Sequence, residues 1–174
     1  MILQIHEGSF VMNRMQQYEE NQPLPFASYP DDEVELQRPI WVGSNCRRGY
    51  GLDYIRKTHQ SCCAYCGTDL TGQYDAWLTM VLDHAVPINV CKQLDIISNG
   101  WCRSLANAVL ACVACNGFCN RYRAVSERRP ETFREFRAMR DRIFVDRRRL
   151  ILGRHKVEQG FYDGRVAGRS TPCS

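Results

Sequence analysis

Two Cys-x2-Cys pairs constrain the fold of this chain more than any other feature of its sequence. The first pair is Cys63 and Cys66 in CAYCG, and the second pair is Cys112 and Cys115 in CVACN. A Cys-x2-Cys turn brings both thiolates to one side, and two such turns form a tetrahedral four-sulfur site that suits zinc. One pair alone could arise by chance, or serve as a redox motif in a thioredoxin-like protein. The two pairs together predict one structural four-cysteine zinc site rather than four buried free thiols.

The stretch between the two pairs, residues 67–111, is far longer than a simple zinc ribbon requires. Zinc bound to the four cysteines would close a long loop, and this loop contains Asp83 and His84 in VLDHAVP. The same closure fixes Asn116, which directly follows the last cysteine. We expect the zinc site to hold these polar side chains in register. Cys62 is an alternative zinc ligand, although its spacing is less usual.

Charge and proline content divide the chain into three sections. Residues 1–40 carry seven Asp and Glu against two Arg and contain four prolines, which predicts an acidic N-terminal arm, flexible or held in extended form. Residues 41–125 hold nine of the ten cysteines and every motif, which predicts the functional domain. Residues 126–174 are expected to form a basic helical extension. A basic C-terminal third suits a polyanion such as DNA or RNA, although a solvated helix face with many ion pairs has the same composition.

Apolar spacing predicts a long helix near the C-terminus. It begins at Pro130, in PETFREFRAMRDRIFVDRRRLIL, where apolar residues fall near one face and arginines cover much of the rest. Pro130 suits a first helical turn, and Thr132 with Glu135 suits a capping box. Gly153 is expected to end or bend this helix.

The middle section predicts the order helix, strand, loop, strand, helix, which belongs to the α+β class. The segment GLDYIRKTHQ is expected to be a short helix with Leu52 and Ile55 facing inward. AWLTMVLD and NAVLA are expected to be strands, and CNGFCNRYRAV is expected to open the next helix.

The sequence has no apolar run of membrane-spanning length, and its N-terminus lacks the regions of a signal peptide. We therefore expect a cytoplasmic protein without membrane association. In that reducing environment cysteines act as metal ligands or remain free thiols. The cysteines outside the two pairs are expected to be small, buried or half-buried thiols: Cys46, Cys62, Cys91, Cys102, Cys119 and Cys173.

The order and spacing of these residues resemble the HNH endonuclease superfamily, the ββα-metal nucleases. The matching pattern runs from the first cysteine pair through LDHAVP to NAVLACVACN, over about residues 60–120. The first family position, a histidine commonly preceded by an aspartate, matches Asp83 and His84. The central asparagine matches Asn107, and the last position matches Asn116. The chain thus resembles an H-N-N variant with two zinc knuckles.

The resemblance implies a fold and a chemistry. The fold is α+β, with a ββα-metal core over residues 41–125, one structural four-cysteine zinc site and flanking helices that include the basic C-terminal helix. His84 acts as the general base on the attacking water, because an imidazole titrates near neutral pH. Asp83 and Asn116 hold one catalytic Mg²⁺ or Mn²⁺ through hard oxygen ligands. Asn107 ties down the loop between the strands and so orients His84. DNA is cut to leave 5′-phosphate and 3′-hydroxyl ends.

Phosphate contacts are expected from arginines, which hold the DNA backbone without reading bases. Many family members carry a lysine three residues after the last motif position, where this chain has Cys119. The expected phosphate-binding arginines are instead Arg121, Arg123, Arg147, Arg148 and Arg149. DNA is the expected partner and RNA the alternative. A concerted cut of both strands would need a homodimer, because each chain has one site.

Two other interpretations stay open. The chain could be a zinc-stabilised nucleic-acid-binding module without catalytic activity, or a protein-interaction module that binds through its acidic arm. Single residues also have simpler explanations, because an Asp-His pair is commonly a surface turn and Asn116 could cap a helix. Asn120, one turn later on the same face, is an alternative metal ligand.

Overall fold

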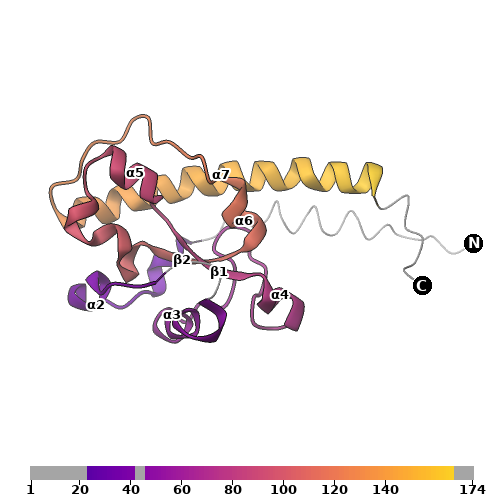
Figure 1. The fold of residues 1–174 in the computed structure, drawn as a ribbon, viewed down its shortest axis with the longest axis horizontal. Helices are drawn as coiled ribbons and strands as arrows, with labels where there is room; N and C mark the ends of the chain where they lie inside the picture. The colour runs from indigo at the N-terminus through magenta and orange to yellow at the C-terminus, as the bar shows by residue number, and fades with distance from the viewer. Residues whose placement is uncertain (1–22, 42–45, 167–174) are drawn as a thin grey trace, which may run out of the picture.

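The computed structural model describes residues 23–41 and 46–166. Two short antiparallel strands lie near the centre of the molecule, and helices surround them (Figure 1). The strands are β1 (Met80–His84) and β2 (Ala108–Cys112). Both are largely apolar, and all five positions of β2 are buried, as suits short strands inside a domain. The fold is therefore mixed α and β, as the sequence predicts.

The register of the two strands sets the layout of the polar residues. Met80 pairs with Cys112 at one end of the ladder, and His84 pairs with Ala108 at the other. β2 then runs directly into α6 (Val113–Phe118). The chain thus forms two strands followed by a helix, with the second cysteine pair at the junction between β2 and α6.

The remaining helical segments are short, apart from α7 (Phe133–Arg165). They are α2 (Glu33–Gln37), α3 (Tyr50–Thr58), α4 (Tyr74–Leu78), α5 (Ile88–Gln93), and the 3-10 turns Pro25–Ser28, Cys46–Arg48, Ile97–Asn99, Trp101–Arg103 and Leu105–Asn107.

The expected strand AWLTMVLD is wrong in its first half. Its first residues belong to α4, which ends at Leu78. Thr79 caps the helix, and its backbone N–H donates to the Ala76 carbonyl at 3.0 Å. Only the run from Met80 onward pairs with β2. A short apolar run fits a helix or a strand equally well, so the strand partner decides.

Helix α3 is present as predicted, and Ile55 packs against the core as expected, but Leu52 does not. Tyr54 is fully buried, whereas Leu52 is 39% exposed. The Tyr54 hydroxyl lies 2.6 Å from the hydroxyl of Tyr29, which also donates to the Ala108 carbonyl. An aromatic ring with a polar tip can enter the core because its hydroxyl finds partners there.

Residues 23–40, predicted to be part of an arm, pack into the core instead. Tyr29 and Leu36 are buried, and the Ile40 N–H donates to the Arg103 carbonyl at 2.8 Å. Pro25 starts a 3-10 turn, and Pro39 forms an isolated antiparallel bridge with Ser104. The rest of the predicted arm, residues 1–22, lies outside the described residues.

Helix α7 runs along the molecule (Figure 1), and its predicted capping box is confirmed. The Thr132 hydroxyl accepts the Glu135 N–H at 3.2 Å, and the Glu135 carboxylate accepts the Thr132 N–H at 3.3 Å. Pro130 lies before the cap rather than in the first turn. The helix continues through Gly153, because one interior glycine costs only about 1 kcal/mol relative to alanine.

One hydrophobic core joins all three sections of the chain. It includes Tyr29 from the first, Leu110 from the second and Phe136 from the third. Among the described residues, no helix combines the length and apolar character that a membrane span needs.

Two cysteines expected to be free thiols are paired in the structure. Cys91 in α5 and Cys102 form a disulfide within the long connection between β1 and β2. The free-thiol prediction is wrong for this pair, because both side chains are buried in the connection and face one another. A disulfide is also unusual in the reducing interior expected from the cysteine content. Cys46 and Cys119 are buried free thiols, as expected, whereas Cys62 is free but exposed, so its expected burial is wrong. Cys173 lies outside the described residues.

Candidate metal centre and adjoining polar site

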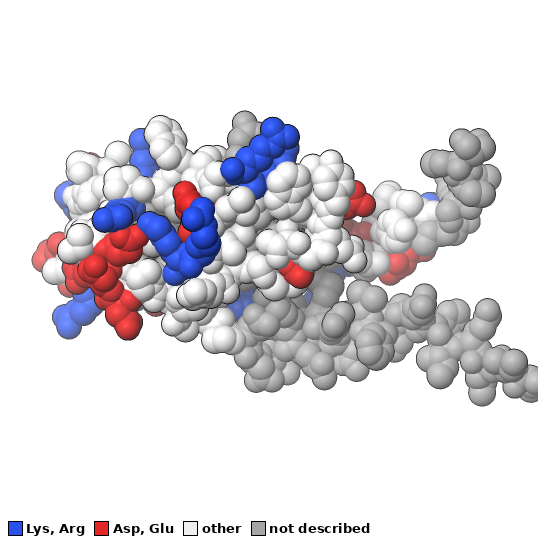
Figure 2. Space-filling model, turned by 90° about the horizontal axis from the view of Figure 1, so that it is seen from below, with Lys and Arg blue, Asp and Glu red and all other residues white. Residues whose placement is uncertain are grey.

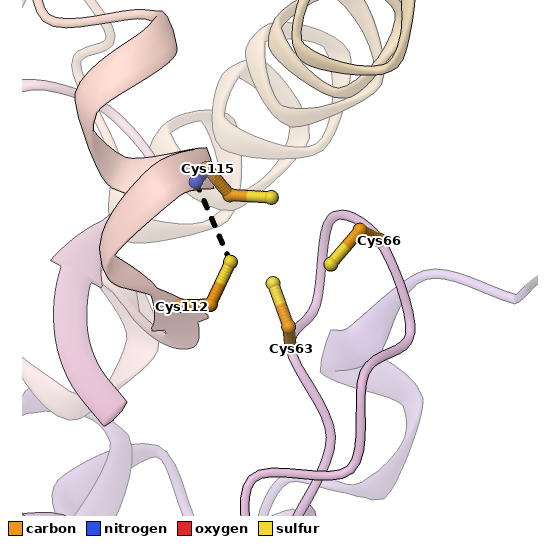
Figure 3. Close-up of side chains that lie close together, drawn as sticks. All are labelled: Cys63, Cys66, Cys112 and Cys115. Atoms are coloured by element: carbon orange, nitrogen blue, oxygen red, sulfur yellow. Dashed lines mark hydrogen bonds between the residues drawn. The ribbon is translucent and has the colours of Figure 1, made fainter. Parts of the chain in front are cut away.

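The four predicted zinc ligands come together. The sulfurs of Cys63, Cys66, Cys112 and Cys115 all lie within 4.8 Å of one another and point into a common space (Figure 3). Four sulfurs bound at about 2.3 Å in a tetrahedron would lie about 3.8 Å apart. Three of these cysteines are buried and Cys66 is half-buried. This cluster can hold a metal ion such as zinc.

Backbone hydrogen bonds shape the turn of the first pair. The Cys63 N–H donates to the Thr68 carbonyl at 2.8 Å, and the Cys63 carbonyl accepts the Gly67 N–H at 2.9 Å. Gly67 has a φ of 76°, a left-handed conformation that glycine adopts without strain. The Ala64 N–H donates to the Leu110 carbonyl at 2.8 Å, which fixes the turn against β2. The first pair is therefore attached to the strand that ends at the second pair.

The second pair uses the junction between a strand and a helix. Cys112 ends β2 and caps α6, because its sulfur accepts the Cys115 N–H at 3.5 Å. Cys115 follows in the first turn of α6, so both sulfurs face the same side. The strand end thus directs one ligand and the helix start directs the other.

Hydrogen bonding among the four thiols separates their pKa values. Contact with Cys112 lowers the pKa of Cys66, and contact with Cys115 lowers the pKa of Cys112 to about 7. The same contacts raise the pKa of Cys63 and of Cys115. The thiolate is the form that binds a metal, so metal binding releases the protons that remain on the four thiols.

His155, on α7, contacts this cluster. Its Nε2 lies 3.0 Å from the Cys115 sulfur, and hydrogen bonding with Cys66 raises its pKa. Its ring packs edge-on against Phe118, with ring centroids 4.9 Å apart. Sequence reasoning missed His155, because it follows Cys115 by 40 residues without a ligand-like spacing. The signal that could have found it was its place on the inward face of α7, four residues after the buried Ile151.

Asp83 lies near the end of β1, and neighbouring groups already hold its carboxylate. Oδ1 accepts the backbone N–H of His84 at 2.8 Å. Oδ2 accepts the Tyr65 hydroxyl at 2.8 Å and the Arg147 Nη2 at 2.9 Å. Tyr65 belongs to the turn of the first cysteine pair, so Asp83 is bound to the metal-binding segment through one side chain.

Two of the arginines expected to bind phosphates are buried. Arg147 is 2% exposed and forms an ion pair with Asp83, and Arg148 is 8% exposed. Arg149 is exposed and pairs with Asp146. The expectation is corrected for Arg147 and Arg148, because the packed face of α7 removes both guanidinium groups from the surface.

His84 is the last residue of β1 and is half-buried. Burial lowers the pKa of its imidazole, the carboxylate of Asp83 opposes this shift, and the positive charges of Arg103 and Arg147 reinforce it. The imidazole is therefore predominantly neutral at pH 7 and able to accept a proton.

Asn107 ties the connection between the strands, as the sequence predicts. It is fully buried, its Oδ1 accepts the Val86 N–H at 2.8 Å, and its Nδ2 donates to the Val86 and Cys102 carbonyls at 3.0 and 2.8 Å. Its own carbonyl accepts the Ala85 N–H at 2.7 Å. These bonds fix the backbone directly after His84.

The other predicted site residues lie in and after α6. Asn116 is half-buried in α6, and Asn120 is exposed beyond its end. Arg121 and Arg123 are exposed. Cys119, at the place of the family's lysine, is buried, and the charge of the neighbouring Arg147 partly offsets the burial that raises the pKa of this thiol.

No family model, curated protein or solved structure matches the chain. The resemblance to HNH nucleases therefore stays a prediction from the residues of this chain.

Proposed function

We propose that the chain is a metal-dependent endonuclease of the HNH type that hydrolyses phosphodiester bonds in DNA. The observation that carries the proposal is the order of functional residues along β1, β2 and α6. His84 ends β1, Asn107 fixes the backbone after it, and β2 leads through the second cysteine pair into α6 with Asn116. A ββα-metal core has the same order of strand, strand and helix.

His84 is the proposed general base. Its imidazole takes a proton from a water molecule, and the water oxygen attacks phosphorus opposite the 3′ oxygen. The P–O3′ bond breaks, and the leaving oxygen takes a proton from solvent, which gives a 3′-hydroxyl and a 5′-phosphate. The lowered pKa of His84 supports this role, because the neutral imidazole is the form that accepts a proton.

Asp83 and Asn116 are the proposed ligands of the Mg²⁺ or Mn²⁺ ion. When bound, such an ion stabilises negative charge on the phosphate and on the leaving oxygen. A carboxylate and an amide oxygen suit a hard cation. Asp83 shares its carboxylate with Arg147, so part of its charge is already compensated. We therefore expect weak ion binding that the phosphate of the substrate strengthens.

DNA contacts are proposed for Arg121 and Arg123, which follow α6 and are exposed. Figure 2 shows that the face with α2 and α3 carries acidic and basic groups close together. Glu35 of α2, for instance, pairs with Lys57 of α3. A face of mixed charge attracts a polyanion little, so the proposal assigns DNA to the side of α6.

A zinc-stabilised nucleic-acid-binding module without catalytic activity is the second candidate. The ion pair between Asp83 and Arg147 favours it, because a carboxylate that is fully used within the fold does not need a metal ion.

Nicking of supercoiled plasmid in Mg²⁺, in Mn²⁺ and in EDTA separates the two candidates. The nuclease relaxes the plasmid only with a divalent ion and retains its zinc in each of these buffers. DNA binding without nicking in any buffer would replace the nuclease by the binding module. A parallel panel of linear, single-stranded, methylated and branched DNA identifies the substrate form.

A further inference from the structure

We infer that Tyr65 and Arg147 form a clamp that positions the Asp83 carboxylate beside His84, so that the cysteine cluster governs the geometry of the proposed catalytic site. The inference rests on the proposed function, because it assigns positioning residues to Asp83 and His84. Neither Tyr65 nor Arg147 touches the substrate in this scheme.

Tyr65 connects the cysteine cluster to Asp83. It lies between Cys63 and Cys66 in the turn of the first pair, and its side chain is fully buried. Its hydroxyl donates to Asp83 Oδ2 at 2.8 Å and accepts from Arg147 Nη1 at 2.9 Å. A movement of the turn backbone would therefore shift the Asp83 carboxylate, because the rigid Tyr65 ring connects the two.

Two packing contacts fix the direction of the Tyr65 ring. The ring stacks on Phe144 of α7, with centroids 5.2 Å apart and planes 24° apart. The guanidinium of Arg147 lies 5.4 Å from the centroid of the same ring. The turn thus fixes one end of the tyrosine and α7 fixes its face.

Arg147 holds both the carboxylate and the backbone around His84. Its Nη2 donates to Asp83 Oδ2 at 2.9 Å, while its Nη1 donates to the carbonyls of His84 and Ala85 at 2.5 and 3.0 Å. A planar guanidinium can make these contacts together because its donors form a fixed fork. Displacement of Arg147 would free the carboxylate and the end of β1 at once.

The chain contains a matched control for this clamp. The Tyr122 hydroxyl donates to Asp146 Oδ2 at 3.0 Å, and Arg149 Nη2 donates to Asp146 Oδ1 at 2.7 Å. The same three residue types meet there, with Tyr122 half-buried and Arg149 exposed. Tyr122→Phe therefore removes a hydroxyl bonded to an aspartate other than Asp83. Because Tyr122 lies between Arg121 and Arg123, it serves as the control for the measurements made without DNA.

The experiment compares Tyr65→Phe with Tyr122→Phe in the full chain. Zinc content and the melting temperature establish that each variant retains the fold. The backbone amide resonance of His84 reports the position of Asp83, because this N–H donates to Asp83 Oδ1. Calorimetric titration with Mn²⁺ measures the affinity of the ion without DNA, and nicking at increasing Mn²⁺ separates half-saturation from the maximal rate.

We expect Tyr65→Phe to keep its zinc, to shift the His84 amide resonance and to weaken Mn²⁺ binding by about 10- to 100-fold, as loss of a group that orients a metal ligand does. High Mn²⁺ should recover much of its nicking rate. Tyr122→Phe should match the wild type in zinc content, in the His84 amide resonance and in Mn²⁺ affinity. If Tyr65→Phe fails to fold, Arg147→Lys takes its place, since it keeps the buried charge but loses the fork.

Different measurements would contradict the clamp and the proposed nuclease function. An unchanged His84 resonance and unchanged Mn²⁺ affinity in Tyr65→Phe would overturn the clamp, even if the wild type nicks DNA. A wild type that never nicks DNA would end the nuclease proposal, while a shifted His84 resonance confined to Tyr65→Phe would still support the clamp.

Discussion

His84 and Arg147 meet at the end of β1 and serve different purposes. The lowered pKa of the His84 imidazole favours its neutral, proton-accepting form. In Arg147, Nη1 and Nη2 donate to Asp83 and to backbone carbonyls, whereas Nε is buried without a hydrogen-bond partner among the described residues. A substitution at His84 should therefore affect chemistry, and a substitution at Arg147 should affect the fold as well.

His84→Ala should lower the nicking rate by about 10²- to 10⁴-fold, the usual contribution of a general base. Zinc content, melting temperature and DNA affinity should stay near those of the wild type, and raised Mn²⁺ should not restore the rate, since no ligand was removed. Initial nicking rates at several Mn²⁺ concentrations measure this. His59→Asn is the control, because it changes an exposed histidine at a left-handed position that asparagine tolerates. Nicking by His84→Ala at the wild-type rate would exclude this residue as the base.

His155→Ala should weaken zinc binding by about 10-fold or more, because a ring N–H that donates to a ligating sulfur stabilises the thiolate. Competition with a chromogenic chelator measures the zinc affinity. His59→Asn again serves as the control. An affinity equal to that of the wild type would mean that His155 packs against the cluster without supporting it.

Local motifs made part of the site predictable at the residue scale. The four cysteines carry their spacing with them, and Asn107 stands directly before a strand whose partner ends at His84. Arg147 was not predictable, because three successive arginines look alike until the packing of α7 selects which of them turn inward. The role of His155 was also not predictable, since its partner Cys115 on α6 is distant in sequence.

At the scale of elements, α7 is both a structural support and a part of the site. It contributes Arg140, which donates to the Ala106 carbonyl at 2.7 Å, and then Arg147 and His155. These residues follow one another at intervals of seven or eight, which keeps them on the same face of the helix. The predicted basic helix is therefore basic on its inner side as well.

Arg147→Ala should destabilise the protein by about 3–5 kcal/mol, because it leaves the carboxylate of Asp83 buried without its ion pair. Arg149→Ala should cost under about 1 kcal/mol, since its ion pair with Asp146 is exposed to solvent. Urea denaturation of the two variants measures the difference in the free energy of unfolding. Equal losses in both would contradict the central position assigned to Arg147.

Secondary structure was predictable where a periodic pattern was long or a cap was explicit. The helix over α7 and its capping box by Thr132 and Glu135 follow from local rules. The boundary between α4 and β1 does not, because Trp77 and Leu78 fit either element and only the pairing of Met80 with Cys112 sets the start of the strand. The packing of residues 23–41 was also not predictable from the sequence, since it depends on distant partners, such as Tyr54 for Tyr29.

At the scale of the whole molecule, the cysteine cluster joins the segment before β1 to the end of β2. Metal binding there is coupled to folding, because ligands so far apart in sequence meet only in the folded chain. One hydrophobic core includes residues from all three sections of the chain. Loss of the metal cluster should therefore destabilise the whole described fold.

Cys112→Ser should reduce zinc to well below one ion per chain and lower the melting temperature sharply, whereas Cys62→Ser, at an exposed thiol outside the cluster, should do neither. Metal analysis and thermal unfolding followed by circular dichroism measure both effects. A Cys112→Ser protein with full zinc and an unchanged melting curve would remove the four-cysteine assignment.

Neutralising Arg121 and Arg123 to Gln should weaken DNA binding at all sequences alike. The slope of log affinity against log salt should fall by about one for each phosphate that the double variant no longer neutralises. A salt titration of binding by fluorescence anisotropy measures the slope. Arg56→Gln, on the mixed-charge face of α3, is the control. An unchanged slope in the double variant would move the DNA to another surface.

The position of α7 in the chain has a consequence for synthesis. Both cysteine pairs, β1 and β2 leave the ribosome before α7 does, so a nascent chain can present the metal ligands while Asp83 still lacks Arg147 and Cys115 still lacks His155. The proposed cutting site is completed only after translation has passed residue 155. A nascent chain whose α7 has not yet left the ribosome would thus lack the contacts of Arg147 with Asp83 and of His155 with Cys115.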